Sequence, residues 1–232
     1  MVNIWFTRNK VFFDNIAPDV LNAKKRITRM VKDCEIRLRG YTNKYDYDLQ
    51  VLHFFDIQYR KMKITKIIEC HFTLADENTT LLCCDGASRG NLGNSGYGFI
   101  IRDHTGQFIA AESGGLGVTT NFVAEIMGTL CALEWAVKHN NLQVIVNTDS
   151  NAAMSVFSNN KLPWFVWARW KLGCKTLRKI HFNHVYREIN FSADFFAKKE
   201  CHLLRGKVLQ FSSRPINMQR TEFPGLPYFR FA

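Results

Sequence analysis

The chain has 232 residues, of which 47% are hydrophobic and 22% charged, and its formal net charge is +11. These proportions are typical of a globular protein with one or two domains and exclude a disordered chain. No apolar run approaches the roughly 18 residues that a membrane span needs, and no apolar stretch followed by a cleavage site opens the sequence. The basic excess suits a polyanion such as nucleic acid, although an ordinary basic surface explains it equally well.

The cysteines are odd in number and include no repeated C-x-x-C pair, which indicates buried thiols in a reducing compartment. They are Cys34, Cys70, Cys83, Cys84, Cys131, Cys174 and Cys201. A zinc site made of Cys174, His181 and His184 is a weaker alternative, because a fourth ligand is missing. We therefore expect an intracellular protein, in the nucleus or the cytoplasm, with no membrane segment.

The first 79 residues predict a small helical segment. Its expected elements are an amphipathic helix at 18–38, a polar loop at 41–48, a short helix at 49–59, a strand or extended arm at 63–72 and a linker at 73–79.

The pattern then changes to three short strands, expected at 81–87, 97–102 and 107–112. A turn rich in glycine and asparagine, residues 88–96, joins the first two strands, and a tight turn at 103–106 joins the next two. Short connections of this kind predict an antiparallel meander. The glycine run opens no helix, so its alternative interpretation as a phosphate-binding loop fails.

The rest of the chain alternates helices with strands. In chain order we expect a helix with Asn121 as N-cap, a parallel strand at 142–148, a short helix capped by Asp149 or Ser150, a helix at 164–178, a strand at 180–187 and a helix at 191–204. The order β-β-β-α-β-α-α-β-α predicts an α/β fold, with a five-stranded mixed sheet and helices on both faces. The domain should span 80–203, with a basic C-terminal tail at 204–232.

Four carboxylates fall at the ends of these elements. Asp85 lies in the first strand, Glu125 in the first turns of the long helix, Asp149 directly after the parallel strand and Asp194 at the start of the last helix. Taken singly, each has a structural explanation as a turn residue, a helix-dipole partner or a helix cap. If they converge, they form a site for hard divalent cations, which indicates metal-assisted phosphodiester chemistry.

The motifs around these carboxylates resemble the type 1 ribonuclease H family, in particular the plant form found in non-LTR retrotransposons and their domesticated relatives. The motifs are C-D-G-A-S at 84–88, G-Y-G-F-I-I-R-D at 96–103, Asn121 with Glu125 and A-L-E-W-A at 132–136, N-T-D-S at 147–150 and H-V-Y-R-E-I-N-F-S-A-D at 184–194. They cover residues 80–203, and the spacing between His184 and Asp194 is the most specific of these features.

The resemblance implies a ribonuclease H fold and a metal-dependent endonuclease. Such an enzyme hydrolyses the RNA strand of RNA–DNA hybrids and leaves a 3′-hydroxyl and a 5′-phosphate. The implied ligands of two Mg²⁺ ions, for which Mn²⁺ can substitute, are Asp85, Glu125, Asp149 and Asp194. His184 would move protons or assist product release. The implied substrate-binding residues are Gly86, Ser88, Asn121 and Ser150. We expect a monomer whose partner is the RNA–DNA hybrid.

The sequence also departs from the family pattern. Phe122 stands where many members have a second asparagine, and no separate hybrid-binding domain or lysine-rich protrusion is evident. Basic residues of the stretch 164–179 are candidates to replace that protrusion. One alternative therefore stays open, a retroelement-derived module that binds nucleic acid but cuts poorly. Another nuclease of the same fold is a further alternative, but the antiparallel meander and the spacing between His184 and Asp194 favour ribonuclease H over it.

Overall fold

The computed structural model describes residues 2–37, 40–42, 45–58, 60–61, 66–199 and 202–232. The chain forms two compact units, Met1–Thr65 and Lys66–Ala232.

The first unit is helical. It contains α1 (Val2–Asp14), α2 (Val20–Asp33), a 3-10 turn and α3 (Asp46–Phe54). Asp19 caps α2 by accepting a hydrogen bond from the Asn22 amide at 2.8 Å. The helix expected at 18–38 corresponds to α2 and the 3-10 turn, whereas α1 was not predicted. None of the α2 or α3 side chains is buried.

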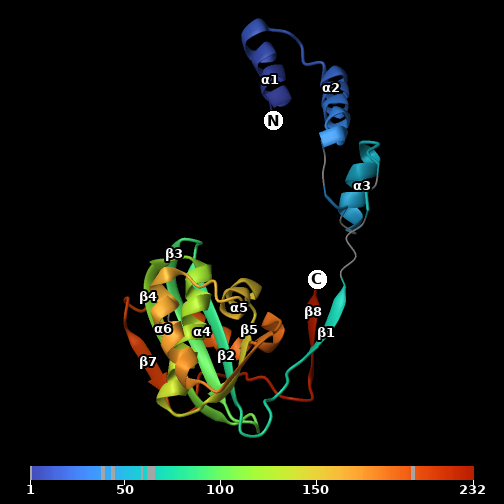
Figure 1. The fold of residues 1–232 in the computed structure, drawn as a ribbon. Coiled ribbons are helices and arrows are strands. Elements are labelled where there is room, and N and C mark those ends of the chain that lie inside the picture. The colour runs from blue at the N-terminus through green and yellow to red at the C-terminus, as the bar shows by residue number, and fades with distance from the viewer. Residues whose placement is uncertain (1, 38–39, 43–44, 59, 62–65, 200–201) are drawn as a thin grey trace. The chain divides into compact units, whose positions relative to one another are not determined.

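The second unit is built around a six-stranded sheet with the strand order β6-β5-β2-β3-β4-β7 (Figure 1). The strands are β2 (Thr80–Arg89), β3 (Gly93–Arg102), β4 (Phe108–Thr119), β5 (Gln143–Thr148), β6 (Lys179–His184) and β7 (Val208–Phe211). Strands β2, β3 and β4 form the predicted antiparallel meander, while β5 and β6 run parallel to β2. The α/β prediction with a mixed sheet is confirmed.

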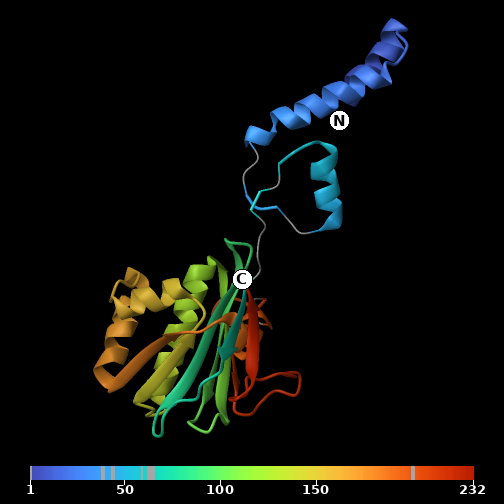
Figure 2. The ribbon, with the colours of Figure 1, turned by 90° about the vertical axis from the view of Figure 1, so that its right-hand side faces the viewer.

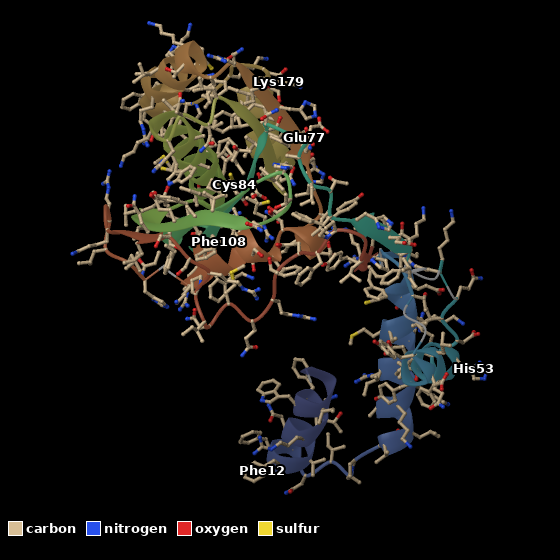
Figure 3. All side chains as sticks on the ribbon, turned by 90° about the horizontal axis from the view of Figure 1, so that it is seen from below. Phe12, His53, Glu77, Cys84, Phe108 and Lys179 are labelled. Carbon is tan, nitrogen blue, oxygen red and sulfur yellow. The ribbon has the colours of Figure 1, made fainter. Side chains whose placement is uncertain are left out.

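Helices cover both faces of the sheet, as predicted. They are α4 (Asn121–Lys138), α5 (Asn151–Ser158), α6 (Trp164–Thr176) and α7 (Phe191–Lys199). Figure 2 shows α4, α5 and α6 gathered on one side of the strands. Cys84 packs in the core on that side and Cys83 packs in the core with α7 on the other, because neighbouring residues of a strand face opposite ways. Figure 3 shows Cys84 in this interior, whereas Lys179 lies at the sheet edge.

The residues expected to form a linker and a tail are part of the second unit. β7 adds a sixth strand to the sheet by pairing antiparallel with β4. The sheet therefore has six strands, not the five that the sequence predicts. Strand β8 (Pro227–Phe231) pairs antiparallel with β1 (Ile67–His71) in a separate two-stranded sheet. Phe72 and Met218 are buried in the core beside α7. Burial of these apolar side chains holds both flanking segments to the unit, which is why it extends beyond 80–203.

Candidate active site

Two strand ends bring the first pair of carboxylates together. Strands β2 and β5 are parallel, and their last register pair is Cys84 with Thr148. Asp85 and Asp149 each follow these partners directly, so the two side chains lie at the same edge of the sheet. Asp85 is 3% exposed. This is the carboxyl edge of the parallel strands, where α/β proteins place their sites.

Helix α4 brings in Glu125 through a close approach at two glycines. A Cβ on Gly86 would lie 2.1 Å from the backbone nitrogen of Glu125, and a Cβ on Gly128 would lie 2.6 Å from the carbonyl oxygen of Asp85. The absence of side chains therefore lets the helix backbone lie against β2. Glu125 Oε2 accepts a hydrogen bond from the Gly86 amide at 3.2 Å, which aims the carboxylate at Asp85.

The N-cap of α4 is Thr120, not Asn121 as predicted. The Thr120 hydroxyl accepts a hydrogen bond from the Val123 amide at 3.3 Å. Asn121 is the first helical residue, and its side-chain amide donates to Glu125 Oε1 at 3.4 Å. The threonine performs the capping, so the Asn121 side chain is directed towards the carboxylates.

Asp85, Glu125 and Asp149 form a compact cluster, with one oxygen from each lying within 4.8 Å of the others. Burial first, and then the charge of its neighbours, raise the pKa of Asp85 well above its usual value. The same causes raise the pKa of Glu125 to about 8. Burial also raises the pKa of Asp149. Three acidic groups of this kind disfavour ionisation of one another unless a positive charge lies among them.

The cluster suits a divalent cation. Among the described residues, Asp85 Oδ2 and Asp149 Oδ1 are buried and make no hydrogen bond. Buried carboxylate oxygens normally have a partner, and hard cations such as Mg²⁺ take oxygen ligands of this kind. The residues therefore fit the metal site that the sequence predicts.

Asp194 differs from these three carboxylates because its oxygens are paired with basic side chains. Arg187 donates to its Oδ1, and Lys198 Nζ lies 2.8 Å from its Oδ2. Burial alone would raise the pKa of Asp194, but the hydrogen bonds from Lys198 and Arg187 outweigh that effect and lower it. The fourth predicted ligand is thus ionised and paired with cations, whereas the other three carboxylates face one another.

His184 is the last residue of β6 and lies beside the end of β5, since its register partner is Thr148. Its Nε2 is 3.2 Å from the carbonyl oxygen of Asp149. The imidazole also contacts Tyr186 edge to face, with ring centroids 5.7 Å apart. The histidine is therefore held next to the carboxylate cluster without joining it.

A cavity of about 610 Å³ opens over the cluster. Its lining includes all four predicted substrate-binding residues, Gly86, Ser88, Asn121 and Ser150. Both serine hydroxyls also have structural partners. Ser88 Oγ donates to the carbonyl oxygen of Thr119 at 3.0 Å, and Ser150 Oγ caps α5 by accepting from the Ala153 amide at 3.2 Å.

Three basic residues line the same cavity and were given no role from the sequence. They are Arg89, Arg187 and Lys198. Two features of the sequence could have indicated a role for them. Arg187 lies inside the H-x-x-R-E motif, and Lys198 follows Asp194 by four residues on one helix, a spacing at which side chains meet. The site therefore combines an acidic floor with basic side chains at its rim.

A family model described as reverse transcriptase-like matches residues 83–200, which is just over half of the chain. The chain belongs to the reverse transcriptase-like family. The match includes all five residues predicted to be catalytic, although the roles of those residues stay predictions. The plant retrotransposon form of the family also stays a prediction.

Known relatives of this reverse transcriptase-like chain include ribonucleases H. A bifunctional protein of Mycobacterium tuberculosis is 33% identical over 99 residues, which are 42% of this chain and 24% of that protein. Ribonuclease HI of Streptomyces coelicolor is 30% identical over 92 residues, 40% of this chain and 35% of that enzyme. The chain thus spans well under half the length of these curated relatives.

The fold of the reverse transcriptase-like domain is that of ribonuclease H. The solved N-terminal RNase H domain of the Mycobacterium tuberculosis protein superposes with a TM-score of 0.50 at 27% identity. The superposition covers 53% of this chain and 94% of that structure. The predicted resemblance to the ribonuclease H family is confirmed. Within the described residues, no helix combines the length and the apolar character required to cross a membrane.

Proposed function

We propose that the second unit hydrolyses the RNA strand of RNA–DNA hybrids with the help of Mg²⁺, or of Mn²⁺ in its place. The observation that carries this proposal is the cluster of Asp85, Glu125 and Asp149, whose oxygens lie within 4.8 Å of one another on a ribonuclease H fold. Relatives named as ribonuclease HI and RNase H domain support the same chemistry.

The carboxylates would hold two metal ions, with Asp194 as the fourth ligand. When bound, such a pair activates the attacking water and stabilises the leaving oxygen of a phosphodiester. Arg187 and Lys198 keep Asp194 ionised, and their positive charges line the cavity where a phosphate would approach. His184, whose Nε2 lies 3.2 Å from the Asp149 carbonyl oxygen, would move protons or assist product release.

The lining of the cavity would recognise the RNA strand. Gly86 brings backbone to the surface of the cavity, and Ser88, Asn121 and Ser150 add polar side chains. The 2′-hydroxyl is the group that distinguishes RNA from DNA at such a surface. The expected products carry a 3′-hydroxyl and a 5′-phosphate.

The proposal is tested by incubating the purified chain with an end-labelled RNA–DNA hybrid in Mg²⁺ or in EDTA. Single-stranded RNA and duplex DNA serve as substrate controls, and Asp85→Asn protein prepared in parallel controls for a contaminating nuclease. We expect Mg²⁺-dependent cuts in the RNA strand of the hybrid alone. Binding of the hybrid without cleavage would contradict the enzymatic proposal and support a binding module.

A further inference from the structure

Glu222 is a fully buried carboxylate in the segment that follows the family match. Its side chain is 1% exposed. Oε2 accepts a hydrogen bond from Arg102 Nη2 at 2.6 Å, and Oε1 accepts one from the Ser192 amide at 2.7 Å. The Ser192 hydroxyl also donates to Oε2. A charge so deeply buried is retained only when it is paired in this way.

The contact with Ser192 caps the helix that carries Asp194. Ser192 is the second residue of α7, and the first amides of a helix have no partner within it. A carboxylate at this end also complements the helix dipole. Glu222 therefore caps α7 from a segment distant in sequence, by accepting a hydrogen bond from a first-turn amide as an N-cap side chain would. Asp194 follows two residues later, in the same helical turn.

The residue directly before this helix is hydrogen-bonded to the strand that carries Asp85. The side-chain amide of Asn190 donates to the carbonyl oxygen of Cys84 at 2.9 Å, and both residues are buried. The start of α7 is thus held by two contacts, one from Asn190 to β2 and one from Ser192 to Glu222.

A second residue of the C-terminal segment holds the connection that leads into α7. The Arg230 guanidinium lies 5.0 Å from the centre of the Tyr186 ring and 3.3 Å from Glu188 Oε2. Tyr186 in turn contacts His184. Residues 222 and 230 therefore contact both ends of the connection between His184 and Asp194.

We propose that Glu222 is a positioning residue for the carboxylate site, and that the segment after the family domain completes this site by fixing Asp194. Without the Glu222 carboxylate, Arg102 stays buried without its counterion and the Ser192 amide loses its acceptor. The first turn of α7 then loses its contact with residue 222, and Asp194 moves relative to Asp85. The inference rests on the proposed function for its kinetic test, but not for its binding test.

A purely structural role would lower stability and leave the site unchanged. Glu112→Gln is the matched control, because Glu112 of β4 is also a buried carboxylate, held by Tyr97 of β3 and Gln210 of β7. It makes no contact with the carboxylate cluster in the structure. Ser192→Ala is a milder second variant, since it removes the hydroxyl that donates to Glu222 and accepts from Arg102, and it keeps the amide bond.

The test measures Mn²⁺ binding to the full chain by electron paramagnetic resonance of the free ion, for wild type, Glu222→Gln, Ser192→Ala and Glu112→Gln. Loss of a supporting residue behind a metal ligand typically weakens affinity or activity about 10–100-fold. We expect about tenfold weaker binding in Glu222→Gln, a smaller loss in Ser192→Ala and wild-type binding in Glu112→Gln. Hybrid cleavage should need correspondingly more Mg²⁺ in Glu222→Gln, with KM for the hybrid unchanged.

Equal Mn²⁺ affinity in wild type and both α7-cap variants would overturn the positioning role, as would an equal loss in Glu112→Gln. If Glu222→Gln does not fold, Ser192→Ala decides the question by the same criterion. A wild-type chain that binds Mn²⁺ but cleaves no hybrid would refute the proposed function alone, and the binding comparison would still decide the role of Glu222.

Discussion

Asp85 on β2 and Gly98 on β3 are register partners in the antiparallel pair, and a helix approaches the sheet closely at each of them. At Asp85 the helix is α4, through Gly128. At Gly98 it is α7, since a Cβ there would lie 2.3 Å from the backbone nitrogen of Ala197. The two helices that carry Glu125 and Asp194 thus contact opposite faces of the sheet at one pair of residues.

Gly98→Ala should destabilise the second unit and move α7. The added methyl meets backbone atoms that cannot rotate away, and overpacking of this kind costs about 1–3 kcal/mol. Urea unfolding measures the loss. Gly173→Ala is the matched control, because nothing lies within 4 Å of its added Cβ and alanine favours the interior of α6 by about 1 kcal/mol. A Gly98→Ala protein as stable as wild type would contradict the close contact.

Asp149→Asn should abolish Mg²⁺-dependent hybrid cleavage while the fold stays intact. The change keeps the size of the side chain but removes one charge from the cluster of three carboxylates. We expect a loss of at least about 1000-fold in rate, equivalent to roughly 4 kcal/mol of transition-state stabilisation. Circular dichroism checks the fold. Asp103→Asn, in the turn between β3 and β4, should cut at the wild-type rate; wild-type cleavage by Asp149→Asn would refute the catalytic assignment.

His184→Ala should slow turnover without abolishing it. The imidazole lies beside Asp149 but outside the carboxylate cluster, so the metal ligands stay in place. Loss of a positioned proton donor or acceptor lowers the turnover rate about 100-fold or more where proton transfer limits that rate. The loss is smaller where product release limits it. The comparison is with His181→Ala, an exposed residue on the same strand. Identical rates for the two variants would remove His184 from the site.

The sequence predicts those parts of the fold that depend on local pattern. Asp149 directly follows an apolar, β-branched run, and that run alone places it at the end of a buried strand. Asp85 and Glu125 are placed in the same way by the strand and helix around them. Their convergence follows once β2 and β5 are parallel neighbours.

Contacts between distant segments could not be predicted from such patterns. β7 is four residues long, and its pairing with β4 depends on contacts such as the one from Gln210 to Glu112. Glu222 is one carboxylate in a polar stretch, and its burial depends on Arg102, which lies 120 positions earlier. Asp194 has the predicted location, but its pairing with Arg187 and Lys198 arises from the turn before α7 and from helical spacing.

The stability of the metal-free chain should fall as pH rises from 5 to 8. The pKa of Glu125 is raised from 4.5 to about 8, so the folded state holds a proton that the unfolded state releases in this window. The stabilisation is fully present below about pH 4.5 and is lost as pH approaches 8. The pKa of Asp194 is lowered, so its contribution to stability is lost as pH falls, and only below about pH 4.

Glu125→Gln removes this ionisation and should flatten the dependence. Each pKa unit corresponds to about 1.4 kcal/mol, and the neighbouring carboxylates share the effect. Between pH 5 and pH 8 we therefore expect the free energy of unfolding to fall by on the order of 2 kcal/mol more in wild type than in the variant. Urea unfolding of wild type and of Glu125→Gln in EDTA, at each pH, measures this difference. Parallel pH profiles would show that Glu125 ionises normally in the folded chain. Mg²⁺ at pH 8 should restore wild type and leave Glu125→Gln less affected, because bound ligand stabilises only the state that binds it.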